Sequence, residues 1–168
     1  SFSLEDTNFF VVYKVYHSHS FDIYWARVSP AGTVLDSAGI PIPTAARWQL
    51  SPPVAFDATN YLVVWEERRT GPSFDIYGAR VSQAGVVLDP DGIPILTTAY
   101  HQKCPSITFD GTNYLIVWEE RRSGYFRDIY GAKVNQAGQV IDSFPVSLQP
   151  GNQVLPALAK GVGNQMLI

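Results

Sequence analysis

The ten-residue stretch Asn60–Arg69, NYLVVWEERR, constrains the fold of this chain more than any other feature, because it occurs again as NYLIVWEERR at residues 113–122. Two less similar copies begin at Asn8 (NFFVVYKVYH) and Asn164 (NQMLI), so the four copies start 52, 53 and 51 residues apart. Self-similarity at a fixed period of about 50 residues is typical of repeat architectures, in which each unit packs on its neighbours. The sequence predicts three full units and the start of a fourth, at residues 1–52, 53–104, 105–155 and 156–168.

The central strand of each unit is apolar on both of its faces. In Tyr61–Glu66, Leu62 and Val64 point to one side and Trp65 to the other, because successive side chains of a strand alternate. A strand of this kind lies in the middle of a sheet, with other layers on both sides. We therefore expect stacked sheets, with Trp65 and its copy Trp118 buried in the core.

Turn chemistry joins the central strand to its neighbours. The short apolar segment Pro53–Phe56 precedes it, and Asp57-Ala58-Thr59-Asn60 between them is typical of a tight turn in a hairpin. A third strand, Asp75–Ser82, follows and recurs in the other units as DIYWARVS and DIYGAKVN. Each unit is therefore expected to begin with antiparallel, hairpin-connected strands.

A glycine follows each third strand at the same place, as Gly32, Gly85 and Gly138. It supplies the positive φ that a hairpin turn needs, so the third and fourth strands are expected to be antiparallel neighbours. The fourth strand, Val86–Leu88, continues into Ile93-Pro94-Ile95, and prolines of this kind suit an outer edge strand, where a missing N–H costs nothing.

Four antiparallel strands per unit, with an edge strand last, correspond to the blade of a β-propeller. The alternatives are a β-sandwich, which needs no 52-residue period, and a β-solenoid, whose coils are shorter. No window shows the periodicity of an amphipathic helix. The predicted fold is all-β, a propeller-like array of four-stranded antiparallel blades with three full repeats and the start of a fourth.

The combined pattern of NYLVVWEE, DIYGARV and VLDPDGIPI resembles a repeat found in secreted and cell-surface proteins of bacteria and archaea, similar to kelch-like and FG-GAP-like propellers. The resemblance covers essentially the whole chain. It implies an extracellular or cell-surface location and a binding or scaffolding role. The first unit departs from the pattern, since Lys14-Val15-Tyr16 stands where the second has Glu66-Glu67-Arg68.

The Glu-Glu-Arg-Arg runs that end the central strands, Glu66–Arg69 and Glu119–Arg122, can be interpreted as catalytic carboxylates or as a sugar-binding rim. Their repetition favours a structural role, because catalytic groups rarely occur in two identical copies. We expect them to form surface ion pairs and turn hydrogen bonds within and between units, each pair contributing about 0–1 kcal/mol.

Aspartates recur at the start of the third strand, at Asp22, Asp75 and Asp128. We expect each carboxylate to accept backbone N–H groups or to pair with a repeat arginine such as Arg68, rather than to act in catalysis. Asp89-Pro90-Asp91-Gly92 has the acid spacing of a calcium loop, but such a loop needs more oxygen ligands and the other units do not repeat both acids. Calcium stays an open alternative at this turn, and no other cofactor is predicted.

Four residues outside the repeat pattern are candidates for ligand or metal contact. His17 and His19 would point the same way on an extended segment, which permits a metal ion but supplies no third ligand. Trp25 replaces the repeat glycine Gly78, and Trp48 lies between units, so these two are the candidate ligand platform.

The composition of the chain limits the classes of partner that we expect. The net charge of −3 gives no basic face for phosphate, which argues against nucleic acid. No run of 18 apolar residues exists, so membrane insertion is not predicted. The single cysteine, Cys104, excludes an intrachain disulfide. A protein or a carbohydrate remains as the expected partner.

Three units alone would leave two open apolar faces, each larger than a monomer normally exposes. The chain also ends within a repeat, at Ile168. We therefore expect either further blades from a longer chain or a homodimer.

Two functions of different class fit these observations. The leading hypothesis is a non-catalytic extracellular domain that binds a partner or builds a surface structure, and the alternative is a carbohydrate-active hydrolase or lyase. An enzyme needs unrepeated acids or histidines that converge on one site. Here the unrepeated polar residues, His17, His19, His101 and Lys103, are expected to scatter over loops, which favours the non-catalytic hypothesis.

Overall fold

The regular elements in the described part of the chain are β-strands. The structure is a computed structural model that describes residues 8–17, 20–42, 48–69, 71–122, 126–160 and 166–167. All pairing between its named strands is antiparallel, which confirms the predicted all-β class. Within the same ranges no helix is long and apolar enough to cross a membrane.

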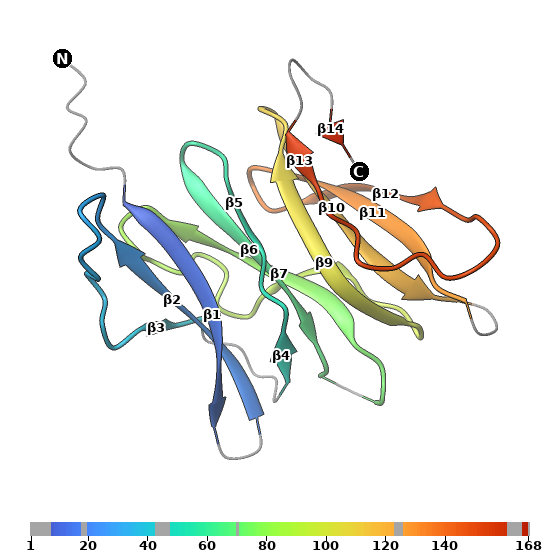
Figure 1. Ribbon diagram of the computed structural model, residues 1–168, viewed down its shortest axis with the longest axis horizontal. Helices are drawn as coiled ribbons and strands as arrows, with labels where there is room; N and C mark the ends of the chain where they lie inside the picture. Colours follow the sequence, from blue (N-terminus) through green and yellow to red (C-terminus); the bar gives the residue numbers. More distant parts are fainter. Residues whose placement is uncertain are drawn as a thin grey trace.

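The strands form sheets that follow one another in chain order (Figure 1). The first sheet comprises β1 (Phe9–His17), β2 (Ser20–Val28) and β3 (Ile40–Pro41), paired in that order. The second has the order β4-β6-β7-β8, with β5 also paired to β6, and comprises β4 (Gln49–Leu50), β5 (Val54–Phe56), β6 (Asn60–Glu67), β7 (Asp75–Ser82) and β8 (Ile93–Leu96). The third has the order β12-β11-β10-β9 and comprises β9 (His101–Phe109), β10 (Asn113–Arg121), β11 (Asp128–Asn135) and β12 (Val140–Ser147). The fourth unit contributes the pair β13 (Ala159–Lys160) and β14 (Met166–Leu167).

The second and third sheets begin earlier than the predicted unit boundaries at residues 53 and 105. Gln49 of β4 and His101 of β9 already pair with the central strands β6 and β10. The chain then bends at a residue with positive φ, Ser51 (φ 52°) or Cys104 (φ 51°), before pairing continues. Neither residue belongs to the types that usually adopt this conformation, which is why the sequence did not reveal the bend.

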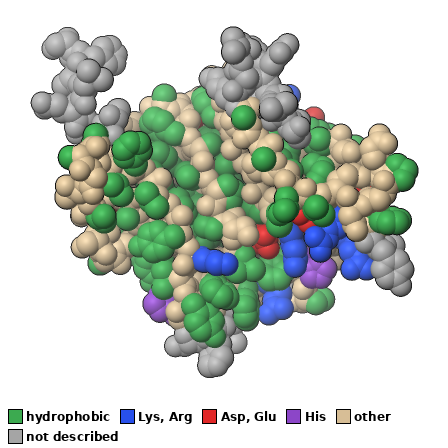
Figure 2. Space-filling model, viewed as in Figure 1, with side chains coloured by type: hydrophobic (Ala, Val, Ile, Leu, Met, Phe, Trp, Pro, Cys, Tyr) green, Lys and Arg blue, Asp and Glu red, His purple; other side chains and the backbone are tan. Residues whose placement is uncertain are grey.

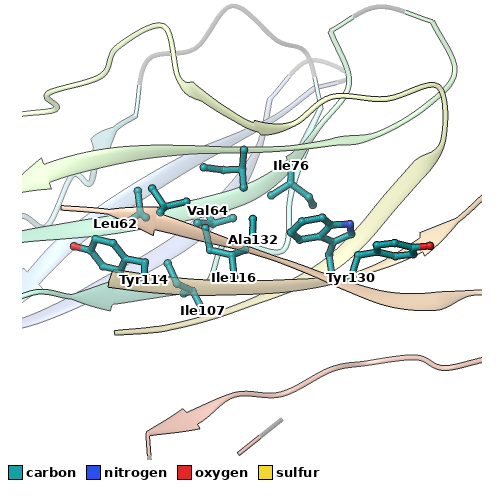
Figure 3. Close-up of a cluster of buried hydrophobic side chains, with 11 residues drawn as sticks. Leu62, Val64, Ile76, Ile107, Tyr114, Ile116, Tyr130 and Ala132 are labelled. Atoms are coloured by element: carbon teal, nitrogen blue, oxygen red, sulfur yellow. The ribbon is translucent and has the colours of Figure 1, made fainter. Parts of the chain in front are cut away.

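Buried apolar side chains fill both interfaces of the second sheet. From β6, Val63 and Trp65 pack toward the first sheet, whereas Leu62 and Val64 pack toward the third, which confirms the predicted alternation. Trp118, the copy of Trp65, is also fully buried, as predicted. Figure 3 shows the interface between the second and third sheets, where Leu62, Val64 and Ile76 meet Ile107, Tyr114, Ile116, Tyr130 and Ala132.

An aspartate fixes the hairpin before the central strand in the second and third units. Asp57 Oδ1 accepts hydrogen bonds from the backbone N–H groups of Thr59 and Asn60, at 2.8 and 2.6 Å. Asp110 makes the same two bonds in the third unit, both at 2.7 Å. A side chain that satisfies its own turn in this way explains why the Asp-x-Thr-Asn sequence specifies the hairpin.

The glycines after the third strands have the predicted positive φ. The values are 83° at Gly32, 87° at Gly85 and 83° at Gly138. Gly85 also lies against the first sheet, since a Cβ added to it would come within 2.3 Å of the Trp25 ring. Gly138 lies against the second sheet in the same way, with a built Cβ 2.7 Å from Ile93, so at both turns glycine serves the backbone conformation and the packing between sheets.

The predicted fourth strand at Val86–Leu88 is displaced in the structure. Val87 forms only an isolated bridge with Val81, and the edge strand is Ile93–Leu96 instead. The Asp-Pro-Asp-Gly turn between them leads the chain away from β7, because its glycine N–H closes a turn onto the first aspartate carbonyl. The third unit is two residues shorter at this point, and its edge strand Val140–Ser147 runs without interruption.

The outer faces of the stack differ. On the third sheet, Leu115, Val117 and Ile129 are buried, and Leu158 from the fourth unit packs against them. On the first sheet, Phe9 is 64% and Val11 44% exposed. One apolar face of the array is thus covered by the following segment, while the other is open to solvent.

Candidate functional site

The glutamates that end the central strands are buried, not on the surface as predicted. Glu67 accepts a hydrogen bond from Trp65 Nε1 at 2.5 Å and forms an ion pair with Arg69. Glu120 repeats this arrangement with Trp118 Nε1, at 3.0 Å, and with an arginine two residues further on. A buried carboxylate is costly unless it is paired and hydrogen-bonded, and both conditions are met here.

The preceding glutamates bind the next unit. Glu66 Oε1 accepts the backbone N–H of Cys104 at 2.8 Å, and Glu119 Oε1 accepts that of Leu155 at 2.7 Å. Glu119 Oε2 also pairs with Arg127 at 2.8 Å. The predicted bonds within and between units are therefore present, and these carboxylates hold adjacent units together.

Two buried glutamines also form hydrogen bonds between adjacent units. Gln49 Oε1 accepts the N–H of Ile23 at 2.9 Å, and Gln102 Oε1 accepts that of Ile76 at 3.2 Å. Each bond joins the start of one unit to the third strand of the unit before it. Together with the glutamates, they satisfy backbone groups that would otherwise be buried without a partner.

One end of the stacked sheets carries cations interleaved with aromatic rings. The Lys14 ammonium lies 5.1 Å from the centre of the Phe21 ring, and Phe21 contacts Trp48 at 5.6 Å between ring centres. The Arg68 guanidinium lies 5.5 Å from Trp48. We call the row that these contacts form the cation–aromatic strip, which consists of Lys14, Phe21, Trp48, Arg68, Phe74 and Lys103.

The strip continues from the second sheet to the third. Arg68 lies 5.7 Å from the Phe74 ring on one side, and Lys103 lies 5.4 Å from the same ring. Phe21 lies near the start of β2 and Phe74 directly precedes β7, whereas Trp48 directly precedes β4 of the next sheet. Stacking of the units therefore brings residues far apart in the sequence into one row.

A basic pocket of about 180 Å³ lies at the end of the strip. It is lined by His101, Lys103, Glu119, Arg121 and Arg127. Figure 2 shows Lys, Arg and His side chains gathered with acidic ones on this part of the surface, with hydrophobic side chains beside them. Three cationic side chains and one carboxylate line the pocket, so its lining residues carry a positive net formal charge.

His101 adds a neutral polar group to this pocket. Burial lowers its pKa first, and Lys103 and Arg121 lower it further, so the ring is neutral near pH 7. Its Nδ1 accepts the backbone N–H of Phe74 at 3.4 Å, which places the remaining ring proton on Nε2. The pocket therefore offers an N–H donor and cations, a set that suits an anionic group.

Of the two predicted aromatic platform residues, the structure places Trp48 in the strip and Trp25 in the core. Trp25 is fully buried and stacks on Phe10 at 4.7 Å between ring centres, so its predicted role as a ligand platform is wrong. The physical reason is the position opposite it in the next sheet, where Gly85 has no side chain and leaves room for the indole.

His17 of the first unit is not brought to the pocket. His17 is exposed at the end of β1, with its ring centre 6.0 Å from that of Tyr24. His19 lies outside the described residues. Among the residues that the structure describes, no group of three or more His, Cys, Asp or Glu is placed to hold a metal ion.

The aspartates of the third strands take structural positions. Asp75 Oδ1 accepts the N–H of Thr98 at 3.1 Å, as predicted for a backbone acceptor, and burial raises its pKa. Asp22 lies within β2, and Asp128 is the first residue of β11. Arg68, the suggested ionic partner, packs on aromatic rings instead.

The proposed calcium loop is occupied by protein groups. Both oxygens of Asp89 accept hydrogen bonds from Arg80, each at 2.8 Å, and the Asp91 carbonyl accepts one from Arg69 at 2.6 Å. The same bidentate pair joins Arg27 and Asp36 in the first unit. These contacts use the acids as braces of the turn, which does not favour the calcium alternative.

Sequence reasoning missed the basic pocket because His101 and Lys103 were expected in a loop, whereas both lie on β9. A signal was present in the departures from the repeat. Lys103 stands where the second unit has Leu50, and Arg127 stands where it has Phe74. Charged replacements of apolar repeat residues, all in the third unit, indicate the site.

No protein-family model matches this chain. No curated protein matches it either. Among solved structures, the crystal structure of alpha-L-arabinofuranosidase from Lactobacillus brevis is similar, with a TM-score of 0.63 at 10% sequence identity. The similarity covers 95% of this chain and 60% of that chain, so it relates this β fold to a part of the larger enzyme.

Proposed function

We propose that this chain is a non-catalytic binding module, built as three blades and the start of a fourth of a β-propeller-type array, that acts outside the cell or on its surface. The four-stranded third sheet with its strands in chain order, and the face-to-face stacking of successive sheets, support the propeller. The resemblance of the repeat to those of secreted and cell-surface proteins supports the location.

The ligand we propose is an acidic glycan. The observation that carries this is the cation–aromatic strip, which crosses all three sheets and ends in the basic pocket. Aromatic faces pack against the apolar faces of sugar rings, and cations pair with carboxylate or sulfate groups. An elongated acidic glycan would satisfy both kinds of group along the strip.

The buried carboxylates support a non-catalytic role. A glycosidase needs two carboxyl groups on opposite sides of a bond in the substrate, with one free to give a proton and the other to receive or attack. Glu66 and Glu119 instead accept backbone N–H groups, and Glu67 and Glu120 are held by tryptophan and arginine. Using them in catalysis would break contacts between units for the first two and contacts within a unit for the other two.

Binding to polymers of defined charge tests this proposal. We expect polygalacturonate and dextran sulfate to bind the protein in isothermal titration at low salt, with affinity falling as salt screens the charges, and neutral galactan and dextran to bind at least tenfold more weakly. The two acidic polymers separate carboxylate from sulfate recognition. Equal binding of the neutral and acidic polymers would contradict an acidic ligand.

Variants locate the binding. Lys103→Gln and Arg68→Gln should each weaken binding of the acidic polymer about three- to tenfold, because each removes a charge of the strip. Lys133→Gln is the matched control, since Lys133 is an exposed lysine on β11 outside the strip. A loss that is equal in all three variants would mean that net charge alone, and not this strip, binds the polymer.

A carbohydrate-active enzyme is the second candidate function, and the similarity to the arabinofuranosidase supports it. If the chain shared that activity, it would release the chromophore from an aryl α-L-arabinofuranoside. We expect no release of the chromophore above background in this assay. Turnover that Glu66→Gln or Glu119→Gln abolishes in a folded protein would replace the binding module with the enzyme.

A further inference from the structure

In the first two units, a glycine turn covers a pair of aromatic rings. Gly92 (φ 74°) closes over Trp65 and Tyr77, with a built Cβ only 3.5 and 3.6 Å from their rings. In the first unit, Gly39 (φ 68°) occupies the same place, and a Cβ there would lie 2.1 Å from the Tyr13 hydroxyl. The repeat therefore includes a Gly turn as the lid of this aromatic pair.

An arginine binds the covering turn in the second unit. Arg69 lies 4.0 Å from the Tyr77 ring centre, and its Nη2 donates a hydrogen bond to the Asp91 carbonyl at 2.6 Å. A Cβ on Gly92 would come within 2.9 Å of that nitrogen, and the φ of 74° is one that residues with a side chain rarely adopt, so both features favour glycine. The group that covers Arg69 and the two aromatic rings in the second unit is therefore a peptide carbonyl followed by a glycine.

The third unit keeps the receiving residues but lacks the turn. Arg122 lies 3.9 Å from the Tyr130 ring centre and pairs with Glu120, as Arg69 does with its own glutamate. Where the second unit has Asp-Pro-Asp-Gly, the third has only Asp142-Ser143 before the strand continues at Phe144. The two residues that form the lid are missing.

The missing lid leaves an opening at the surface. A pocket of about 140 Å³ is lined by Trp118, Arg122, Tyr130 and the edge strand, and a larger one shares Arg122 and Tyr130. The Arg122 side chain is 42% exposed, against 29% for Arg69 under its turn. In the second pocket Asp128 faces the same space, so a neutral group with both donors and acceptors fits better than an anion.

We propose that the Arg122–Tyr130 opening is a binding site for a glycine-containing turn of a partner protein, which takes the place that Asp91 and Gly92 occupy in the second unit. The peptide carbonyl before the glycine accepts a hydrogen bond from the Arg122 guanidinium, and the glycine lies against the Trp118 and Tyr130 rings. The site is separate from the basic pocket and does not depend on the glycan proposal.

A cyclic peptide containing Asp-Pro-Asp-Gly is the probe, titrated into the ¹⁵N-labelled protein. We expect saturable shifts of the Ser143 and Phe144 amides and of the Arg122 side chain at millimolar peptide. The same peptide with alanine in place of glycine should bind at least tenfold more weakly. Equal binding of the two peptides, or shifts caused by neutral oligosaccharides instead of the peptide, would overturn the proposal.

A graft tests the site without weakening its binding groups. Replacing Asp142-Ser143 by Asp-Pro-Asp-Gly rebuilds the lid of the second unit over Arg122, and it should abolish peptide binding while the protein stays folded. Arg122→Lys should weaken binding at least fivefold, because lysine lacks the planar fork, whereas Arg69→Lys, under its own lid, should leave it unchanged. A grafted protein that still binds the peptide would show that the opening is not the site.

Discussion

Glu66 and Cys104 are joined across two sheets by one hydrogen bond, in which the carboxylate Oε1 accepts the cysteine backbone N–H at 2.8 Å. Cys104 has a φ of 51°, which a non-glycine residue adopts only when its surroundings hold it there. The bend that starts a unit is thus stabilised by the unit before it. Burial, followed by Glu119 and Glu66, raises the pKa of the Cys104 thiol to about 11.

Removing the Glu66 carboxylate should destabilise the protein. Glu66→Leu leaves the Cys104 N–H buried without its acceptor, which costs about 1–3 kcal/mol of unfolding free energy. Glu66→Gln retains an acceptor oxygen and should cost less. Urea unfolding of the three proteins measures the difference, and equal losses in the two variants would show that the hydrogen bond is not the cause.

Ala58 and Gly111 occupy the same hairpin position in two units, with φ values of 74° and 108°. Ala58→Gly should therefore raise the unfolding free energy by up to about 1 kcal/mol, and Gly111→Ala should lower it by about 1 kcal/mol. Nothing lies within 4 Å of the Cβ that Gly111→Ala would add, so steric contact does not interfere. Thermal unfolding checks both signs, and changes of the same sign would contradict the argument.

Gly85 should be less replaceable than Gly32, although their φ values of 87° and 83° are alike. Alanine at either position must adopt a positive φ, which lowers the unfolding free energy by about 1 kcal/mol. At Gly85 its Cβ also meets the Trp25 ring, whereas nothing lies near Gly32, so Gly85→Ala should cost about 1–3 kcal/mol more. Equal melting temperatures would mean that the first and second sheets can move apart at no cost.

The ion pair of Arg27 and Asp36 should make stability fall in acid. Hydrogen bonds from Arg27 lower the pKa of Asp36 from 3.8 to about 2. Since the folded pKa is below the unfolded one, the contribution is complete above pH 3.8 and is lost as the pH falls toward 2. For a partly exposed pair we expect about 0–1 kcal/mol. Asp36→Asn should remove this part of the slope when stability is measured from pH 5 to 2, and an unchanged slope would contradict it.

The exposed face of the first sheet should cause self-association. Phe9 and Val11 point outward there, while Phe10 and Val12 pack toward the second sheet. Light scattering should detect dimers or larger species as the concentration rises, and Val11→Lys should reduce them by charging the face. A wild-type monomer at high concentration would show that the face needs no partner.

Features that depend on one unit could be predicted from the sequence. The alternation around Trp65 and the positive φ of Gly85 follow from local periodicity and turn chemistry, and both are confirmed. The propeller arrangement stays a prediction. Local rules suffice here because each strand and turn places its own side chains.

Features that depend on two units could not be predicted. Trp25 is buried because Gly85 of the next sheet leaves room for it, and Glu66 is buried because its acceptor atoms meet a bend 38 residues later. The strip likewise exists only after stacking, since Arg68 reaches both Trp48 and Phe74. Nothing in the composition of one repeat reveals what the adjoining repeat places opposite it.

The groups that Glu66, Glu119, Gln49 and Gln102 recognise at the junctions are backbone N–H groups. Every residue except proline carries such a group, so these hydrogen bonds set almost no demand on the side chains of the unit that they receive. Gene duplication could therefore add, delete or exchange a unit in one step, with the new neighbour docked by atoms that only a substitution to proline removes. The surface of each unit would then be free to diverge, which is how one array could acquire different ligands along its length.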